Sequence, residues 1–429
     1  MELKVDDLVY TRTALPNGLR ILTAPMPATR SVAVSIYVGA GSRYETPAEA
    51  GISHLLEHLL FKGTEKRRSA PEISELIEGV GGVLNASTDR ELTTYYAKVA
   101  RPYFDRAADV LTDMIRNPLL AADELEKERK VVIEELAATA DSPAQLVDVL
   151  LDSTMWPDQP LGRDIGGSEA SVAGITREST IDYLRRQYVP NNIVITVAGA
   201  IDHEEVVTTV EAALGDWRPG APATWFPVID GQAAPRAAVQ YKRTEQAHIE
   251  IAVHGLSNLH PDRFALDMMS VVLGEGMSSR LFIELREQRA LCYDVHSYSA
   301  HYMDTGAFAV YAAVDPAKAV EATEALIGEL AKLRADGVTE EELMKAKDLS
   351  KGRLLLRMED TRAVSGWLGV QEMLNGEVRT PDDVVAMLDA VTTDDVRRVA
   401  RELLDARRMT FAICGPYKSP RRFAPLLNL

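Results

Sequence analysis

Residues 51–61, Gly51-Ile52-Ser53-His54-Leu55-Leu56-Glu57-His58-Leu59-Leu60-Phe61, decide the interpretation of this 429-residue sequence. At about 100° per residue, a helix places Ile52 and the leucines on one face. His54, Glu57 and His58 then cluster on the opposite face. Residues four apart lie one turn apart, so both imidazoles can reach one ion with the Glu57 carboxylate beside them. The segment is therefore predicted to be an amphipathic helix with a functional polar face.

Two histidines and a glutamate on one helix face have the chemistry of a hydrolytic zinc site. Zinc takes imidazole nitrogens and keeps one position for water, whose pKa the ion lowers so that a nearby carboxylate can remove its proton. His54 and His58 are the expected ligands, and Glu57 is the expected base that activates a zinc-bound water. The alternative is a solvated polar face on an ordinary amphipathic helix, because H-x-x-E-H is a short pattern.

The third ligand is expected on the helix predicted over 123–136. Catalytic zinc sites with two histidines commonly take a carboxylate as the third protein ligand, and the inverted histidine motif is a known zinc signature. This segment is the richest in acids, and Leu125, Val132 and Leu136 define its buried stripe.

The position of each acid around this helix separates the candidates. Glu134 points nearly opposite the buried stripe, into water. Glu128 and Glu135 are seven residues apart, so they share a flank at the edge of the buried face. Glu135 is then a plausible ligand, and Glu128 a carboxylate that orients a ligand or holds charge. The alternative for Glu128 is an ion pair on the helix surface.

Composition excludes several other classes of function. The formal net charge of −17 disfavours a nucleic-acid surface, which needs clustered cations. No run approaches the roughly 18 apolar residues of a membrane span, so no membrane partner is expected. Two cysteines make no disulfide framework. Residues 1–7 lack the apolar core of a signal peptide, and the expected location is the cytoplasm.

The chain is too long for one ordinary core, and its two halves have the same layout. Residues 218–235 hold four prolines and two glycines and are predicted to be a linker. Each half opens with a predicted strand, 31–38 or 247–253, followed by a glycine-containing turn and a helical pattern, 50–61 or 262–273.

The expected fold is α+β, with two related domains that each contain a mostly antiparallel sheet packed with helices. The predicted domains are 1–217, which binds the metal, and 236–429, a related domain without a metal site that contacts substrate.

The motifs resemble those of the pitrilysin family of zinc peptidases, which includes insulysin and the mitochondrial processing peptidase. Residues 54–58 match the family's inverted motif, and residues 128–135 are similar to its distal motif. In the family a glutamate 77 residues past the second histidine is the third ligand, which falls on Glu135, and an earlier glutamate falls on Glu128. The resemblance implies one Zn²⁺ per chain, held by His54, His58 and Glu135.

The resemblance extends from about Leu15 to about Pro416. Residues 81–88 are similar to the family's turn and edge strand, which pairs with the substrate backbone. Residues 278–293 are similar to its second-half motif, in which an arginine and a tyrosine seven residues apart contact the scissile region. The implied substrate-strand residues are Leu84, Asn85, Ala86 and Ser87, and the implied contact residues are Arg286 and Tyr293.

The second half has no equivalent of the metal motif. If the two helices correspond, the places of His54, Glu57 and His58 fall near Leu266, Met269 and Ser270, none of which can bind zinc and activate water.

The length fits the family's short form, one half of a clamshell that assembles as a pair. The resemblance therefore implies a zinc metalloendopeptidase that hydrolyses peptides or unfolded polypeptides inside a dimeric chamber, most simply that of a homodimer.

Three other functions remain open. The chain can be the catalytic subunit of a heterodimer with a zinc-less partner. It can be a non-proteolytic structural or presenting subunit, although such subunits usually lack part of the metal motif. The residues alone also permit a zinc hydrolase whose substrate is not a peptide.

Cobalt or manganese would be accepted by the same ligands.

Overall fold

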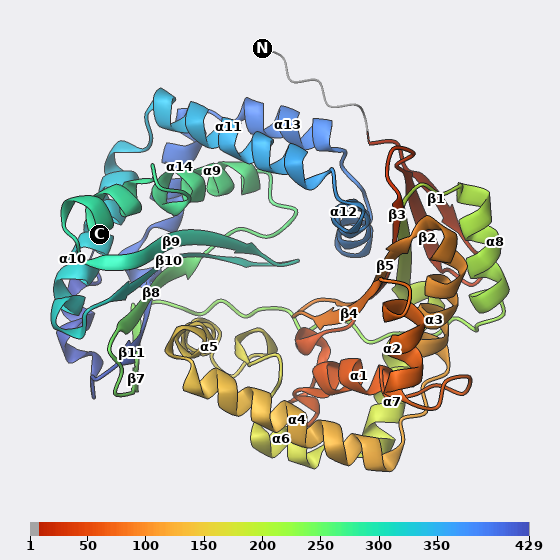
Figure 1. The fold of residues 1–429 in the computed structure, drawn as a ribbon. Helices are drawn as coiled ribbons and strands as arrows, with labels where there is room; N and C mark the ends of the chain where they lie inside the picture. The colour runs from red at the N-terminus through yellow and green to blue at the C-terminus, as the bar shows by residue number, and fades with distance from the viewer. Residues whose placement is uncertain (1–7, 429) are drawn as a thin grey trace. The chain divides into compact units, whose positions relative to one another are not determined.

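The computed structural model describes residues 8–428. The segment 1–7, in which no signal peptide is expected, lies outside the described residues. The fold is α+β with two sheets packed against helices, which confirms the predicted class (Figure 1).

Strands and helices alternate along both halves of the chain. The strands are β1 Thr11–Ala14, β2 Arg20–Pro25, β3 Ser31–Val38, β4 Val83–Thr88, β5 Thr93–Ala100, β6 Ile193–Gly199, β7 Arg236–Tyr241, β8 Ala247–His254, β9 Cys292–His301, β10 Gly306–Val314 and β11 Thr410–Gly415. The α-helices are α1 Ile52–Leu60, α2 Ala70–Glu78, α3 Phe104–Arg116, α4 Ala122–Asp141, α5 Pro143–Met155, α6 Glu169–Gly174, α7 Arg177–Gln187, α8 His203–Leu214, α9 Arg263–Gly274, α10 Ala319–Asp336, α11 Glu340–Arg357, α12 Thr361–Leu374, α13 Pro381–Ala390 and α14 Thr393–Leu403.

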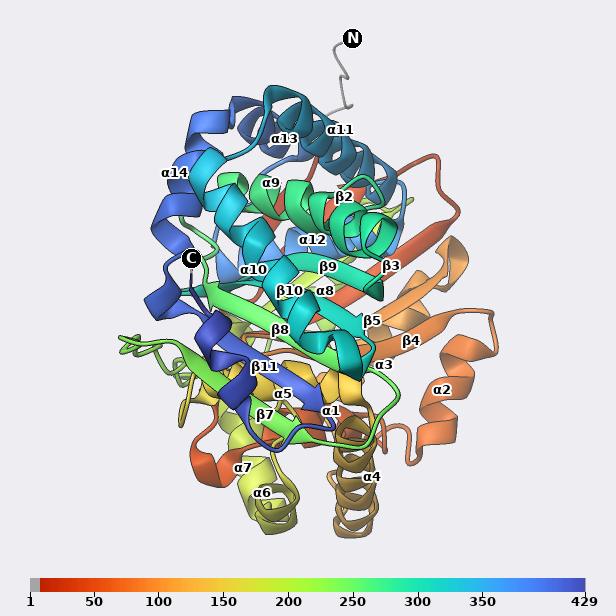
Figure 2. The same cartoon turned by 90° about the vertical axis from the view of Figure 1, so that its left-hand side faces the viewer.

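The two sheets repeat one strand order. The first runs β1-β2-β6-β3-β5-β4, and the second runs β7-β11-β8-β10-β9, which Figure 2 shows face on. Each sheet is antiparallel except for one parallel pair, β2 with β6 in the first and β7 with β11 in the second. Because β2, β6, β3, β5 and β4 correspond in order to β7, β11, β8, β10 and β9, the expected relationship between the two halves is confirmed.

The elements predicted around the polar helix are present at the expected places. β3 covers the predicted strand 31–38, and β8 extends the predicted 247–253 by one residue. The helical patterns at 50–61 and 262–273 form α1 and α9. The predicted linker 218–235 contains no helix or strand.

The compact units of the structure are not contiguous in sequence. The first consists of the chain up to Leu136, Asp164–Phe226 and Leu354–Asp382, and the second of Ala137–Arg163, Pro227–Arg353 and the chain from Asp383. One crossing, after Phe226, falls within the predicted linker. The other crossings place a segment of each half in the opposite unit, so the predicted domains 1–217 and 236–429 do not coincide with the compact units.

Two helices, α5 and α12, explain why the predicted domains differ from the compact units, because each lies in the unit formed mainly by the other half of the sequence. We call them the exchanged helices. α12 packs on the face of the first sheet that carries Tyr37, where a Cβ at Gly369 would lie 2.0 Å from the Tyr37 ring. Ser365 of α12 donates a hydrogen bond to Ser35 of β3, Oγ to Oγ at 2.8 Å. In the second unit, α5 buries Val147, Leu151 and Met155 against the second sheet. Each sheet is therefore covered on one face by a helix that the other half of the sequence supplies.

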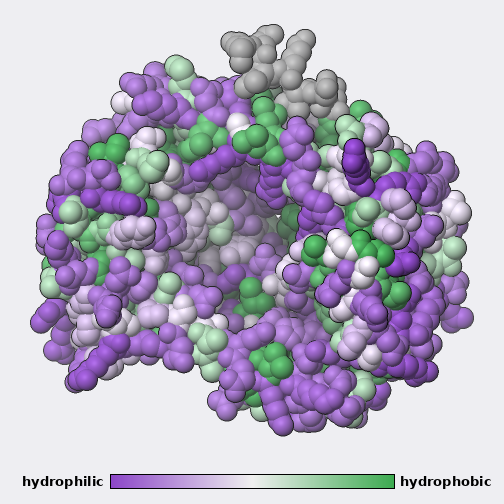
Figure 3. Space-filling view, in the orientation of Figure 1, coloured by the Kyte–Doolittle hydropathy of each residue, from purple (hydrophilic) through white to green (hydrophobic). Residues whose placement is uncertain are grey.

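One face of the molecule, drawn in Figure 3, is predominantly polar, with small groups of hydrophobic side chains. Among the described residues, no helix combines the length and apolar character needed to cross a bilayer.

Candidate metal centre

Helix α1 is held at both its apolar face and its N-terminus. The apolar residues on the inner face of α1 are all buried: Ile52, Leu55, Leu56, Leu59 and Leu60. The buried carboxylate of Glu45 accepts hydrogen bonds from the backbone N–H groups of Gly51 and Ser53, both at 2.9 Å. These are among the N–H groups that a helix leaves unpaired at its start. Glu45 thus fixes where the helix begins and which way its polar face points.

The polar face of α1 meets helix α4 at three atoms suited to a metal. His54 Nε2 lies 3.6 Å and His58 Nε2 3.7 Å from Glu135 Oε2. Two ligands at the usual zinc distance, in tetrahedral geometry, are about 3.3 Å apart. Within residues 8–428 this is the one group of three such side chains whose ligand atoms lie within 4.8 Å of one another. The donor set and its spacing fit Zn²⁺.

Glu128 lies on the side of His58 away from this cluster. The His58 Nδ1 atom and Glu128 Oε2 are 3.1 Å apart, and Lys62 Nζ lies 2.8 Å from Glu128 Oε1. The Glu128 side chain is only 6% exposed. A carboxylate that accepts the Nδ1 proton leaves the lone pair of Nε2 directed at a metal. The position of Glu128 is that of an orienting carboxylate, and its ion pair with Lys62 is part of the same arrangement.

His54 has different surroundings from His58. Burial, and then the neighbouring His58, lower the pKa of His54 from its ordinary value. A neutral imidazole is the form that binds metals. Among the described residues, no group makes a hydrogen bond to His54 Nδ1.

Glu57 faces the same side of α1 without belonging to the cluster. Its Oε2 atom accepts a hydrogen bond of 2.6 Å from the hydroxyl of Thr88 at the end of β4. Burial raises the pKa of Glu57 from its ordinary value, while the Thr88 hydrogen bond opposes that shift. Glu57 is therefore a carboxylate in electrostatic contact with His58 and Glu135, and it is hydrogen-bonded to the strand that ends at Thr88.

The acids of α4 have the orientations expected from its period. Leu125 and Val132 are buried, and Leu136 is half-buried. Glu134 is exposed, and within residues 8–428 it belongs to no group of three potential metal ligands. Glu135 is half exposed, at 50%, although its Oε2 atom reaches both histidines.

The predicted substrate strand is an edge strand. β4 is paired on one side with β5 and ends the order of the first sheet. Along 83–88, exposed and half-buried residues alternate, with Asn85 and Ser87 exposed and Leu84 and Ala86 half-buried. Such an edge presents N–H and C=O groups to which an extended peptide can add.

Arg286 and Tyr293 lie together in the second unit. Arg286 belongs to a π-helical segment, Phe282–Gln288, and Tyr293 to β9. The Arg286 Nη1 group donates a 2.8 Å hydrogen bond to the Tyr293 carbonyl oxygen, and its Cζ atom lies 4.6 Å from the centroid of the tyrosine ring. The Tyr293 side chain is 73% exposed, so its hydroxyl is available to a ligand.

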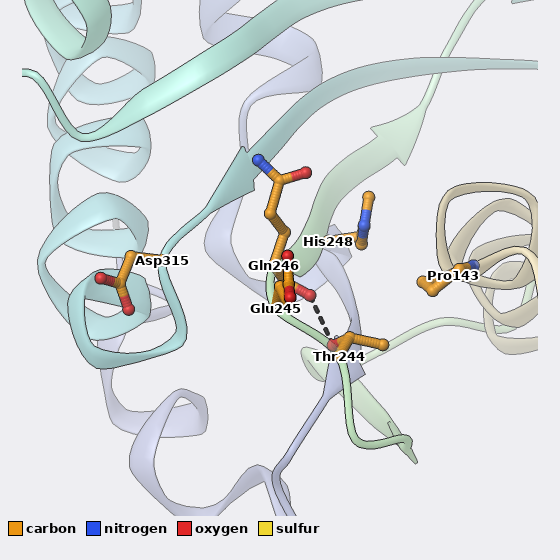
Figure 4. A pocket seen from close by; sticks show the side chains of 6 residues that line it. All are labelled: Pro143, Thr244, Glu245, Gln246, His248 and Asp315. Atoms are coloured by element: carbon orange, nitrogen blue, oxygen red, sulfur yellow. Dashed lines mark hydrogen bonds between the residues drawn. The ribbon is translucent and has the colours of Figure 1, made fainter.

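The equivalent helix in the second half, α9, has no histidine or glutamate at the positions that correspond to His54, Glu57 and His58. Leu266, Met269 and Ser270 of α9 are all buried. A cavity of about 600 Å³ lies elsewhere in the second unit, and Figure 4 shows His248 of β8 and Pro143 of α5 on its wall. Its lining residues are Pro143, Thr244, Glu245, Gln246, His248 and Asp315. These residues do not form a group of three metal-binding side chains within residues 8–428.

Three residues around the centre were not anticipated from the sequence. Lys62 follows His58 by four residues, and helical spacing could have suggested its place. Thr88 ends a predicted strand, but nothing in the sequence brings that end to Glu57. Glu45 lies in a loop whose path only the folded chain reveals.

A duplicated α+β chain with this donor set has the arrangement of metal-dependent hydrolases with an inverted histidine motif. Models of two domains match the chain: "Insulinase (Peptidase family M16)" over residues 20–169 and "Peptidase M16 inactive domain" over residues 174–350. The chain belongs to peptidase family M16. The second match begins before the linker and includes much of the half in which the metal motif has no equivalent.

Relatives support this assignment, and solved structures have the same fold. The chain is 39% identical to an uncharacterized zinc protease of Streptomyces coelicolor, over 95% of this chain and 90% of the relative. It is 37% identical to an uncharacterized zinc protease of Bacillus subtilis, over 91% and 95%. A protease from Helicobacter pylori has the same fold with a TM-score of 0.89 and 25% identity, covering 95% of this chain and all of that one. A peptidase M16 inactive domain from Pseudomonas fluorescens superposes with a TM-score of 0.87 at 18% identity, covering 96% and 99%.

Proposed function

We propose that the protein is a zinc endopeptidase that hydrolyses peptides or unfolded polypeptides. The observation that carries the proposal is the cluster of His54 Nε2, His58 Nε2 and Glu135 Oε2. The Glu57 carboxylate, on the helix that carries both histidines, interacts electrostatically with His58 and Glu135. The family assignment and the relatives named zinc proteases support the same chemistry.

The side chains have separate roles in this proposal. His54, His58 and Glu135 hold the metal, and Glu128 orients His58 through Nδ1. When bound, zinc supplies an acidified water and polarises the scissile carbonyl. Glu57 accepts the proton of the attacking water at the oxygen that Thr88 does not engage, and later returns it to the leaving amine. The substrate backbone adds to the edge of β4 along Leu84–Ser87.

Removal of the metal tests this function directly. We expect the purified protein to contain one zinc per chain and to cleave an unstructured peptide. A chelator should abolish cleavage, and added Zn²⁺ should restore it, because no other group in the proposal activates the water. Metal content by mass spectrometry, measured beside the cleavage rate, decides the outcome. Cleavage that persists in metal-free protein would contradict the proposal.

We further propose that the active form is a homodimer in which Arg286 and Tyr293 act at the partner's metal centre. The metal cluster belongs to the first unit, whereas Arg286 and Tyr293 belong to the second, and the second half has no cluster of its own. In an isologous pair the second unit of each chain would face the metal centre of the other chain, giving two equivalent sites. Tyr293 would donate a hydrogen bond to the oxyanion of the tetrahedral intermediate.

A subunit-mixing experiment tests the shared site. Glu57→Gln and Tyr293→Phe chains are each expected to be nearly inactive, because loss of one oxyanion donor alone costs about 10²–10³-fold. In a mixed dimer, one site carries both defects and the other carries neither. After random exchange of equal amounts, activity should recover to about a quarter of the wild-type value. Absence of recovery, with exchange demonstrated by two affinity tags, would contradict the shared site.

The matched control places both substitutions in one chain. When that double variant is mixed with wild-type chains, each mixed dimer should lose both of its sites if the sites are shared. Mixing should then lower the activity below that of the wild-type chains alone. If each chain serves its own site, the wild-type chains should keep their activity.

A further inference from the structure

We propose that Thr88 is a positioning residue that fixes the carboxylate of Glu57 through its hydroxyl group. This inference rests on the proposed function, in which Glu57 is the base. The Thr88 Oγ1 atom donates a 2.6 Å hydrogen bond to Glu57 Oε2. A glutamate has three rotatable side-chain bonds, and a second anchor removes much of that freedom before substrate arrives.

The backbone of Thr88 is itself held firmly. Thr88 pairs with Thr93 of β5, and the Asp89 N–H group donates to the Leu92 carbonyl oxygen at 2.9 Å to close the turn between the strands. The segment 41–45 braces that turn, with the N–H groups of Ser42 and Arg43 donating to the carbonyl oxygens of Asp89 and Arg90. The side chain of Arg43 also forms a buried ion pair with Glu91 at 2.5 Å.

Residues 41–45 also fix the position of Glu57, the acceptor of the hydrogen bond from Thr88. Glu45 binds the first N–H groups of α1, the helix that carries Glu57. Residues 41–45 therefore contact both α1, which carries Glu57, and the turn that follows Thr88. These contacts fix the distance between Glu57 and Thr88, and neither a metal nor a substrate takes part in them.

The position of Thr88 gives it a place in the reaction. It follows directly on Leu84–Ser87, the segment proposed to pair with the substrate backbone. In this proposal, one part of β4 binds the peptide backbone, and the next residue, Thr88, orients Glu57. Because a misplacement of about 1 Å can cost about 10²-fold in rate, loss of this anchor should lower turnover more than binding.

The test compares substitutions of Thr88 with a matched change across the strand pair. Thr88→Val keeps the shape but removes the hydroxyl, and kcat should fall about 10–100-fold with KM nearly unchanged. Thr88→Ser should restore most of the rate, because serine keeps the donor. Thr93→Val removes the hydroxyl that donates to the Ala40 carbonyl oxygen at 2.9 Å but keeps the backbone pairing with Thr88, and should leave kcat unchanged. Zinc content and thermal unfolding of each variant show whether it is folded and loaded.

Two further measurements separate this inference from the function on which it rests. Metal-free Thr88→Val should bind a labelled peptide as tightly as the metal-free wild type, as measured by fluorescence anisotropy. Weaker binding, or a folded Thr88→Ser as slow as Thr88→Val, would overturn the positioning role. Wild-type kcat in Thr88→Val beside an inactive Glu57→Gln would overturn this inference alone, whereas a fully active Glu57→Gln would overturn the proposed function itself.

Discussion

In a Glu57→Gln variant, zinc content is expected to remain at one ion per chain, while cleavage of an unstructured peptide falls by about 10²–10⁴-fold. Glutamine has nearly the same size and can still accept the hydrogen bond from Thr88 through its amide oxygen. Its amide cannot accept a proton from water. The substitution therefore removes the base and keeps the geometry around it. Cleavage rate and metal content, measured on one preparation, check the result.

The control for this variant is the same chemical change on the exposed side of α4. Glu134→Gln alters the net charge by the same amount and should have wild-type activity. Full activity in Glu57→Gln at normal zinc content would remove Glu57 from the mechanism. Joint loss of zinc and activity would instead assign Glu57 a role in holding the metal.

The second large effect is expected from the neighbour of that control residue. Glu135→Gln should weaken zinc binding by more than about 100-fold, because even the partners of metal ligands contribute 10–100-fold to affinity. The Glu135 Oε2 atom is the one that approaches both His54 and His58. An amide oxygen is a poorer ligand than a carboxylate, and activity should disappear with the metal. Competition with a chromogenic chelator measures the affinity.

Comparison of Glu135→Gln with Glu134→Gln makes this test specific. The two residues are adjacent on α4 and differ by one helical step of about 100°. Loss of metal in Glu134→Gln and retention in Glu135→Gln would show that the ligand is Glu134 and that the orientation of α4 is wrong.

Periodicity was sufficient to predict one strand of the first sheet, β3, and the buried face of the helix that carries Glu135, α4. The alternation in 31–38 predicts a strand because one face must meet a core, and β3 covers those residues. The stripe of Leu125 and Val132 orients α4 correctly, since a helix that buries one face has little freedom to rotate.

Long-range features could not be predicted in the same way. The apolar face of α12 shows that the helix is covered, but not that β3, more than three hundred residues earlier, lies beneath it. The contact of Thr88 with Glu57 likewise depends on a turn and a helix that share the brace 41–45. Hydrophobic pattern is a local property, whereas these contacts depend on the path of the whole chain.

The exchanged helices have a consequence for the order in which the protein is made. When Gly199 leaves the ribosome, the last strand of the first sheet exists, but α12 has not been synthesised. Until then the sheet face that carries Leu22, Tyr37 and Ala198 is not packed against α12. In the same way, α5 is synthesised before the strands of the second sheet, against which it packs. Nascent chains with uncovered apolar surface are prone to aggregate and are typical clients of chaperones. The first compact unit therefore cannot be completed until α12 has been synthesised, long after the strands of its sheet.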